Sequence, residues 1–162
     1  RFGKMAILPG GNHTVCAGLA ALGPEPLSEE FHCNYLYSVL QRKRVKVKAA
    51  LLDQCVVAGL GNIYADEVLF ASGILPQRLC CDLSFGEVGL LCEKIKSILT
   101  EAILHRGTSF RDYVDGEGQK GSHQAFLQVY QRENQPCYQC GEIIKRVKIG
   151  GRSSHFCPHC QK

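Results

Sequence analysis

The sequence lacks any run of about 18 apolar residues, the length that a membrane-spanning helix requires. This absence argues against a helical membrane anchor, and we expect no membrane partner. A signal-peptide pattern is also lacking, and the chain begins at Arg1 rather than at a methionine. We therefore expect a piece of a longer protein that works in the cytoplasm. Excess charge is also small: the net charge is +4, and it favours an anionic partner only weakly.

The composition predicts a globular chain with reduced cysteines. The 162 residues are 45% hydrophobic, enough for one moderate core and a small satellite module. Ten cysteines raise the possibility of a disulfide framework. Their spacing argues against it, since four form two Cys-x-x-Cys pairs and the others are scattered, as is typical of reduced cytosolic core residues. The scattered cysteines are Cys16, Cys33, Cys55, Cys80, Cys81 and Cys92.

The rest of the chain is organised around residues 48–76, KAALLDQCVVAGLGNIYADEVLFASGILP. This stretch predicts a short helix over residues 49–52, a tight turn, and a second helix over about residues 64–72. Two glycines in the turn allow a sharp bend and close approach to a bulky group. Asn62 stands where it could cap the second helix, and the free N–H groups there favour an anion such as phosphate. A plain helix hairpin with a glycine-rich turn is the alternative.

Two further helices are predicted on either side of this stretch. One begins at Ser28, which is followed by two glutamates, and runs to about Gln41. The other begins with a capping box at Ser84 and runs to about His105. The long second helix has one apolar face, so we expect it to be the central helix of the core.

Two polar segments could face a ligand. Residues 42–48 carry five cations in seven positions, directly before the glycine-rich turn. They fit a strip that faces phosphates, although such runs are more often solvated loops. Residues 108–123 are polar and glycine-rich, and they fit either a lid over a ligand or an ordinary connector. Asp53, Asp66 and Glu67 are expected to cap or pair rather than to act as acids.

The C-terminal cysteines predict a metal module. Cys137 and Cys140 are separated by sixteen residues from Cys157 and Cys160, a spacing that fits a structural zinc site of four thiolates. Residues 143–149 and 153–156 predict a β-hairpin between the pairs. So small a module cannot build its own core, so one Zn2+ is expected to supply the folding energy. A catalytic zinc and a redox dithiol are the alternatives.

The predicted hairpin is rich in cations, which suits contact with a nucleic-acid backbone. They are Lys145, Arg146, Lys148 and Arg152. Arg152 could also be an ordinary exposed arginine at the tip. His155 and His159 are possible substitute ligands, but four cysteines already saturate a tetrahedral site.

The segments LLDQ and AGLGNIYADEVLFASGILP resemble the helix-two-turns-helix motif of the formamidopyrimidine-DNA glycosylase and endonuclease VIII family. The resemblance extends along the whole chain but covers only the C-terminal part of the family. It implies a mainly α fold in three parts. These are the end of an N-terminal β-sandwich with its linker over residues 1–22, a helix-two-turns-helix DNA-binding domain over residues 23–133, and a β-hairpin zinc finger of four cysteines over residues 134–162.

The resemblance also implies a function and a set of site residues. Members of the family are bifunctional base-excision repair enzymes, and an insertion at residues 108–123 is typical of those that remove oxidised purines such as 8-oxoguanine and formamidopyrimidines. The implied partner is damaged double-stranded DNA. The protein is expected to bind it as a monomer, in the bacterial cytoplasm at the nucleoid. The implied DNA contacts are Phe2, Lys43, Lys48, Gly61, Asn62, Tyr130 and Arg152.

The implied catalytic groups lie mostly outside this chain. In the family a proline amine at the N-terminus attacks the sugar C1′, assisted by a glutamate and a lysine, and β,δ-elimination then cleaves the abasic strand. Here only Arg152, which matches an arginine linked to δ-elimination, belongs to that set. We therefore expect the parent protein to be a glycosylase and AP lyase, and this chain alone to be inactive. A non-catalytic zinc-finger module that binds DNA or RNA is the alternative.

Overall fold

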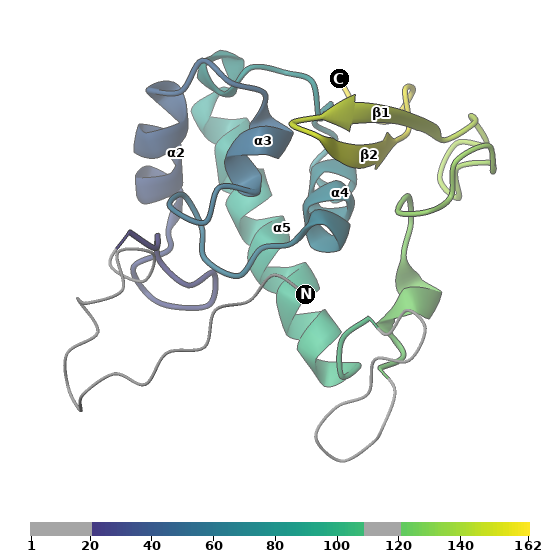
Figure 1. Ribbon diagram of the computed structural model, residues 1–162, viewed down its shortest axis with the longest axis horizontal. Coiled ribbons are helices and arrows are strands. Elements are labelled where there is room, and N and C mark those ends of the chain that lie inside the picture. Colours follow the sequence, from purple (N-terminus) through teal and green to yellow (C-terminus); the bar gives the residue numbers. More distant parts are fainter. Residues whose placement is uncertain (1–20, 109–120) are drawn as a thin grey trace.

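The computed structural model describes residues 21–108 and 121–162, and Figure 1 shows how they are arranged. Three of the sequence predictions lie wholly or mostly outside these residues: Phe2, the remnant of a β-sandwich, and most of the polar segment 108–123. In the described chain, no helix has the length and apolar character needed to cross a membrane.

Four α-helices form the body of the described chain (Figure 1). The longest is α5 (Phe85–Leu104), against which α2 (Cys33–Gln41) and α4 (Asn62–Ala71) both pack. The short helix α3 (Val47–Leu51) packs against α4. Strands β1 (Lys145–Ile149) and β2 (Arg152–Phe156) form an antiparallel hairpin, and β2 lies along α4. The predicted mainly α fold with a terminal β-hairpin is thus confirmed. Two short 3₁₀ helices are η2 (Cys80–Asp82) and η3 (His123–Phe126).

Helix α2 begins later than the sequence predicted. Ser28 directs its N–H and its Oγ at the carbonyl of Glu25, at 3.0 Å and 2.9 Å, and so closes a turn. Phe31 follows that turn and is fully buried. The residue that caps α2 is His32, whose Nδ1 accepts from the N–H of Tyr35 at 3.2 Å. The predicted start at Ser28 was wrong because short polar side chains stabilise turns as readily as helix ends.

Helices α3 and α4 both start earlier than the sequence predicted. α3 begins at Val47, and α4 begins at Asn62 with Gly61 as its N-cap residue. Asn62 is therefore the first helical residue and does not cap, because no side-chain hydrogen bond caps this helix. In the turn, Gly59 has a φ of 76°, and its N–H donates to Oε1 of Gln54 at 2.7 Å. A positive φ explains one of the two glycines of the turn.

The predicted capping box of α5 is confirmed. Oγ of Ser84 accepts from the N–H of Glu87 at 3.3 Å, while Oε2 of Glu87 accepts from the N–H of Ser84 at 2.8 Å. At the other end, Gly107 has a φ of 77° and its N–H donates to the carbonyl of Ala102 at 2.7 Å. Both ends of the longest helix thus follow from local sequence signals.

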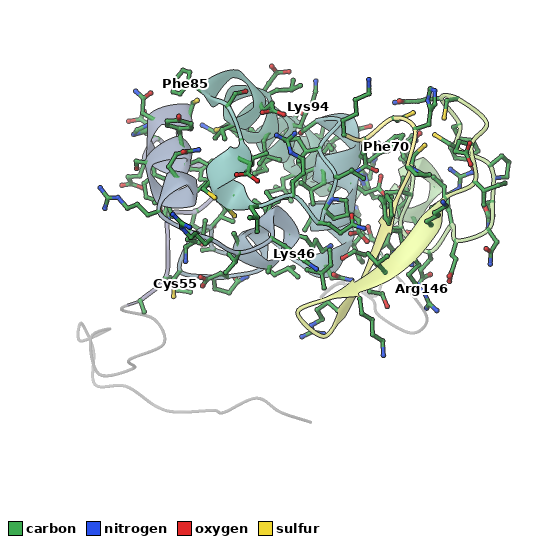
Figure 2. All side chains as sticks on the ribbon, turned by 90° about the horizontal axis from the view of Figure 1, so that it is seen from above. Lys46, Cys55, Phe70, Phe85, Lys94 and Arg146 are labelled. Carbon is green, nitrogen blue, oxygen red and sulfur yellow. The ribbon has the colours of Figure 1, made fainter. Side chains whose placement is uncertain are left out.

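Two hydrophobic clusters share helix α4. The larger one gathers leucine, valine and other apolar side chains from α2, α3, α4 and α5. The smaller one lies in the C-terminal module and is built from Val129, Cys137, Ile144 and Cys157 around Phe70 of α4. The small core of the module is therefore completed by Phe70, a side chain of the helical body. Figure 2 shows Phe70 at the boundary between the helices and the hairpin.

Candidate nucleic-acid interface and metal centre

The four cysteines of the C-terminal module meet at one point. Their Sγ atoms all lie within 4.8 Å of one another. Those of Cys137 and Cys160 are 3.9 Å apart, and those of Cys140 and Cys157 are 3.5 Å apart. A tetrahedral zinc with Zn–S bonds of about 2.3 Å separates its sulfurs by about 3.8 Å. The cluster therefore fits one Zn2+ in a closed structural site, as the spacing predicted.

Tight turns bring each pair of cysteines together. In the first turn the N–H of Gly141 donates to the carbonyl of Cys137 at 2.9 Å, and Gly141 has a φ of 78°. In the second, the N–H of Cys160 points at Sγ of Cys157 at 3.4 Å. His155 takes no part in the cluster, because its ring Nδ1 lies 3.0 Å from Oδ2 of Asp66. The cluster thus consists of the four cysteines, as the sequence predicted, and His155 is not a substitute ligand.

The end of the chain fastens the zinc module to the helical body. The N–H of Lys162 donates to the carbonyl of Gly73 at 2.8 Å, and the N–H of Leu75 donates back to the carbonyl of Lys162 at 3.0 Å. Nε2 of the buried Gln161 donates to the carbonyl of Ile74 at 2.8 Å. These bonds, together with the contacts of Phe70, set the hairpin beside α4.

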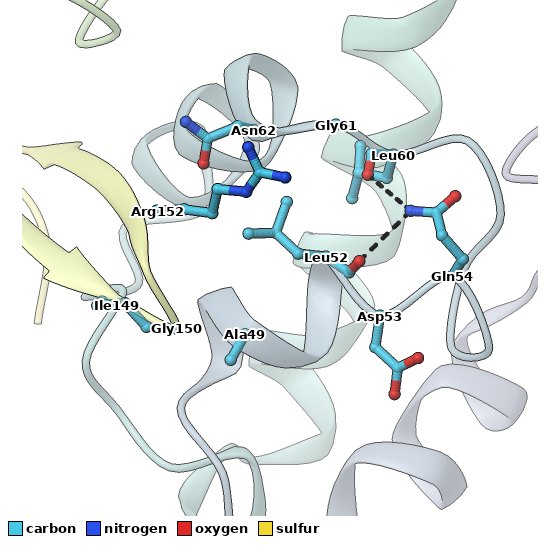
Figure 3. A pocket seen from close by; sticks show the side chains of 10 residues that line it. All are labelled: Ala49, Leu52, Asp53, Gln54, Leu60, Gly61, Asn62, Ile149, Gly150 and Arg152. Carbon is cyan, nitrogen blue, oxygen red and sulfur yellow. Dashed lines mark hydrogen bonds between the residues drawn. The ribbon is translucent and has the colours of Figure 1, made fainter. Parts of the chain in front are cut away.

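An open pocket of about 530 Å³ lies between the tip of the hairpin and the turn that joins α3 to α4 (Figure 3). Gly61 and Asn62 line it from the start of α4, and Gly150 and Arg152 line it from the hairpin. Figure 3 shows the Arg152 guanidinium extending towards Asn62 and Gly61. Arg152 is exposed, and within the described residues it has no ion-pair partner. The pocket thus holds an unneutralised cation opposite the beginning of a helix.

The start of α4 adds further hydrogen-bond donors to the pocket. The first N–H groups of a helix have no partner within the helix, and its dipole favours negative charge there. Nδ2 of Asn62 donates to the carbonyl of Ser153 at 3.1 Å, which ties the start of α4 to β2. A Cβ added at Gly61 would meet nothing within 4 Å. The predicted anion-binding character is therefore consistent with the groups that line this pocket.

Lys48 lies beneath the pocket rather than in it. Its side chain is fully buried, and Nζ donates to Oδ1 of Asp66 at 2.6 Å and to the carbonyl of Asn62 at 2.9 Å. Burial lowers the pKa of Lys48, although the adjacent Asp66 carboxylate opposes this shift. In this structure the ammonium therefore supports the backbone at the start of α4.

Lys43 is also paired with a carboxylate. Its Nζ lies 3.0 Å from Oδ2 of Asp53, and this hydrogen bond, with another from the N–H of Cys55, lowers the pKa of Asp53. Both side chains of the pair are partly exposed. Asp53 lines the far end of the pocket, so its charge there is compensated by Lys43.

Tyr130 contacts the hairpin at His155 and does not line the pocket. Its ring meets that of His155 edge-on, with centroids 5.1 Å apart. The backbone around it is held by Glu67, whose carboxylate accepts from the N–H groups of Gln128, Val129 and Tyr130 at 2.8–3.0 Å. Burial nevertheless raises the pKa of Glu67. The expectation that Asp53, Asp66 and Glu67 cap or pair is confirmed.

The structure also reveals a contact that sequence reasoning missed. Asp66 joins His155 across the boundary between α4 and β2, through the backbone N–H and the ring Nδ1 of the histidine, both at 3.0 Å from Oδ2. The two residues are 89 positions apart, and no local pattern links them.

Comparison with known families assigns both parts of the chain. Residues 22–114 match the family described as the formamidopyrimidine-DNA glycosylase H2TH domain, and residues 134–162 match the zinc finger found in FPG and IleRS. Formamidopyrimidine-DNA glycosylases from Desulforamulus reducens and Synechocystis sp. are 50% and 48% identical to this chain over 162 residues. The matches cover 100% and 99% of this chain but only 58% and 56% of those relatives.

Solved structures of similar proteins share the fold. The MutM (FPG) protein of Thermus thermophilus superposes with a TM-score of 0.88 at 39% identity, over 94% of this chain and 57% of its own. A complex of Lactococcus lactis Fpg with DNA containing an abasic site has a TM-score of 0.86 at 38% identity, over 94% of this chain and 56% of its own. A complex of that protein with DNA containing FAPY-dG has a TM-score of 0.84 at 37% identity, with the same two coverages.

Proposed function

Since this chain belongs to the formamidopyrimidine-DNA glycosylase family, we propose that it is the DNA-binding C-terminal part of a bifunctional base-excision repair enzyme. The parent enzyme would remove oxidised purines such as 8-oxoguanine and formamidopyrimidines, and it would cleave the abasic strand by β,δ-elimination. Its partner would be damaged duplex DNA, bound by a monomer in the bacterial cytoplasm. Support comes from relatives of that name at about half identity and from similar structures solved with damaged DNA.

The observation that carries the DNA-binding proposal is the juxtaposition of Gly61, Asn62 and Arg152 around one open pocket. A backbone phosphate carries negative charge and several acceptor oxygens, and the pocket presents a guanidinium and the first N–H groups of a helix. Neither the φ of Gly61, −100°, nor any neighbour of its missing Cβ requires a glycine at this position. A phosphate that approaches the backbone closely does explain that glycine.

The other predicted DNA contacts enter the proposal with different roles. Lys48 would act on DNA indirectly, because its ammonium holds the carbonyl of Asn62 and has no exposed surface. Lys43 is partly exposed and would contact a phosphate while remaining close to Asp53. Tyr130 and Phe2 would contact the DNA beside the lesion, as the resemblance implies. Contacts of this kind to the backbone set affinity and register rather than sequence preference.

The zinc would have a structural role in this function. The hairpin carries Arg152, and Arg152 faces α4 only while the four cysteines hold the hairpin folded. The resident metal supplies folding energy and no open coordination position. The division into residues 1–22, 23–133 and 134–162 remains part of the proposal, with the middle and last parts sharing the phosphate-binding pocket.

Salt dependence of DNA binding tests the proposal. Each phosphate contact made by a cation steepens the dependence of log K on log salt, so Arg152→Ala should weaken binding to duplex DNA and reduce the slope by about one unit. Fluorescence anisotropy with a duplex containing an abasic-site analogue measures both quantities. Arg146→Ala is the matched control, because it removes the same charge from the same hairpin, at a residue whose Nε lies 2.9 Å from Glu133.

Two outcomes would count against the proposal. An unchanged salt slope for Arg152→Ala would show that this guanidinium does not neutralise a phosphate. Binding to single-stranded RNA as tight as binding to the duplex would favour the alternative, a zinc-finger module without a role in DNA repair.

A further inference from the structure

A single buried carboxylate joins three elements below the phosphate-binding pocket. Asp66 of α4 is 1% exposed, and both of its oxygens are occupied. Oδ1 accepts from Nζ of Lys48, which follows Val47 at the start of α3. Oδ2 accepts from His155 of β2 twice, through the backbone N–H and through the ring Nδ1. An ionised carboxylate only accepts hydrogen bonds, so the Nδ1 of His155 carries the proton and donates.

Asp66 and Asn62 lie one turn apart on the same face of α4, and each is bonded to β2. Asn62 donates to the carbonyl of Ser153, and Asp66 accepts from His155. Four helical residues rise by about 6 Å and two strand residues by about 6.6 Å. The distance from Asn62 to Asp66 along α4 therefore matches the distance from Ser153 to His155 along β2. α4 and β2 therefore lie side by side in a defined register. Arg152 is the residue that precedes this matched segment.

This register determines where the two sides of the pocket stand relative to each other. Lys48 holds the carbonyl of Asn62 at 2.9 Å and is itself held by Asp66, so the carboxylate also orients the start of α4. From the same side chain, the bonds to His155 hold the strand that carries Arg152. One group thus positions both the start of α4 and the strand that carries the Arg152 guanidinium.

We propose that Asp66 and His155 are positioning residues for the phosphate-binding pocket, which they assemble by fixing β2 and Arg152 against the N-terminus of α4. The inference rests on the proposed function, because it assigns these residues to the site that would hold a DNA phosphate. Neither residue touches the DNA phosphate in this assignment.

Attachment of the zinc module to the helical body does not by itself require the hydrogen bonds of Asp66 with Lys48 and His155. Phe70 and the small cluster around it already bury apolar surface between the module and the helical body. Burying charged groups is expensive, and well-packed apolar side chains often stabilise a boundary as well or better. Directional hydrogen bonds add what apolar packing lacks, namely one defined register between a helix and a strand. A pocket made of groups from both elements depends on that register.

Three substitutions at His155 test the assignment in the zinc-loaded chain. His155→Asn keeps a donor near the position of the ring Nδ1, His155→Gln moves the donor to about the position of Nε2, and His155→Leu removes it. We expect His155→Leu and His155→Gln to weaken binding to an abasic-site duplex about tenfold, and His155→Asn to bind within about threefold of the parent chain. Zinc content and thermal unfolding, measured for each variant, show whether the module stays folded.

A double-mutant cycle separates positioning from general stability. If His155 acts through Arg152, then His155→Leu should change binding by less than about twofold in a chain that already carries Arg152→Ala. If His155→Leu loses zinc or unfolds, the comparison of His155→Asn with His155→Gln decides, because both keep a polar side chain. Equal binding by these two variants, or fully additive effects in the cycle, would overturn the assignment. A null effect of Arg152→Ala alone would instead overturn the proposed function.

Discussion

The two glycines of the central turn have different physical roles. Gly59 has a φ of 76°, in the left-handed region where a side chain is strained. Gly61 has a φ of −100°, which any residue adopts, and the space where its side chain would project is empty within 4 Å. Conformation therefore accounts for Gly59. For Gly61 the explanation lies in what the pocket binds.

Serine at each of these positions should separate the two roles. Gly61→Ser keeps a favourable N-cap residue, so we expect the thermal stability of the chain to stay close to that of the parent. The added side chain enters the pocket and should weaken binding to duplex DNA. The matched variant Gly59→Ser should be destabilised by about 1–2 kcal/mol, because its residue must keep a positive φ. Calorimetry and anisotropy measure the two effects, and undiminished DNA binding by a folded Gly61→Ser would contradict this account of the glycine.

At the scale of elements, the start of α5 shows how a local signal acquires a tertiary partner. Glu87 completes the capping box with Ser84 and also pairs with Arg78 through both carboxylate oxygens. Arg78 in turn donates to the carbonyl of Lys162 at 3.1 Å. The hydrogen bond from Arg78, followed by that from the N–H of Ser84, lowers the pKa of Glu87 from 4.5 to about 2. One side chain thereby connects the longest helix with the end of the zinc module.

This lowered pKa predicts a pH-dependent contribution to stability. Because the carboxyl group titrates lower in the folded chain, its contribution is complete above about pH 4.5 and is lost as the pH falls towards about 2. Glu87→Gln should therefore lower the melting temperature at neutral pH, and the difference from the parent chain should shrink at about pH 3. The side chain is 35% exposed, so solvent screening keeps the effect modest. Circular dichroism of the helices at both pH values checks it, and a difference that grows with acidity would have the wrong sign.

At the scale of the whole molecule, we expect the zinc module to depend on its metal for folding and the helical body to fold without it. The larger hydrophobic cluster lies entirely within residues 31–99, outside the zinc module, while the smaller one includes two of the zinc ligands, Cys137 and Cys157. Chelation of the metal should therefore unfold residues 134–162 and leave α5 largely intact. The affinity for DNA should also decrease on chelation, because the unfolded module no longer holds Arg152 at the pocket.

Metal analysis and one pair of variants check this prediction. The freshly purified, reduced chain should hold one zinc, and a content below about half an equivalent would contradict the assignment. Cys157→Ser should lose zinc and DNA affinity while it keeps most of its helical signal. Cys33→Ser, which alters a cysteine outside the cluster, should retain both zinc and affinity.

The whole molecule should also be inactive as a lyase. Schiff-base formation needs an unprotonated amine held within reach of C1′. The amine that the resemblance assigns to this step lies at the N-terminus of the family's proteins, in a domain that this chain does not contain. The buried Lys48 amine is engaged by Asp66, so it cannot replace that amine. Losing the alignment of an amine with the sugar forfeits about 7–11 kcal/mol of rate acceleration.

Borohydride trapping with abasic-site DNA tests this last prediction. We expect no covalent complex above the level given by a control protein with an ordinary α-amine. Trapping at a rate close to that of a full-length family member would contradict it, whereas recovery of trapping on addition of a separately expressed N-terminal half would support it.

The sequence by itself determined the features that depend on neighbouring residues. The spacing of the cysteine pairs specified the metal site, because two-residue turns place sulfurs within one tetrahedron. The capping box at Ser84 located the start of α5, and the hairpin between the cysteine pairs followed from the same kind of local pattern. Ser28 marks the limit of such reasoning, since one short polar residue stabilises both a turn and a helix start, and its surroundings selected the turn.

Only the tertiary structure decided which side chains face each other across the two parts of the molecule. Lys48 stands at the end of a cationic run that reads as exposed, yet the fold buries it against Asp66. Asp66 and His155, like Asn62 and Ser153, meet over about ninety positions of chain. Helix and strand periodicity state which residues share a face of one element, but the packing of α4 against β2 alone selects the opposing face. The pocket that joins Asn62 to Arg152 exists because that packing is held by the four-cysteine module, by Phe70 and by one buried carboxylate.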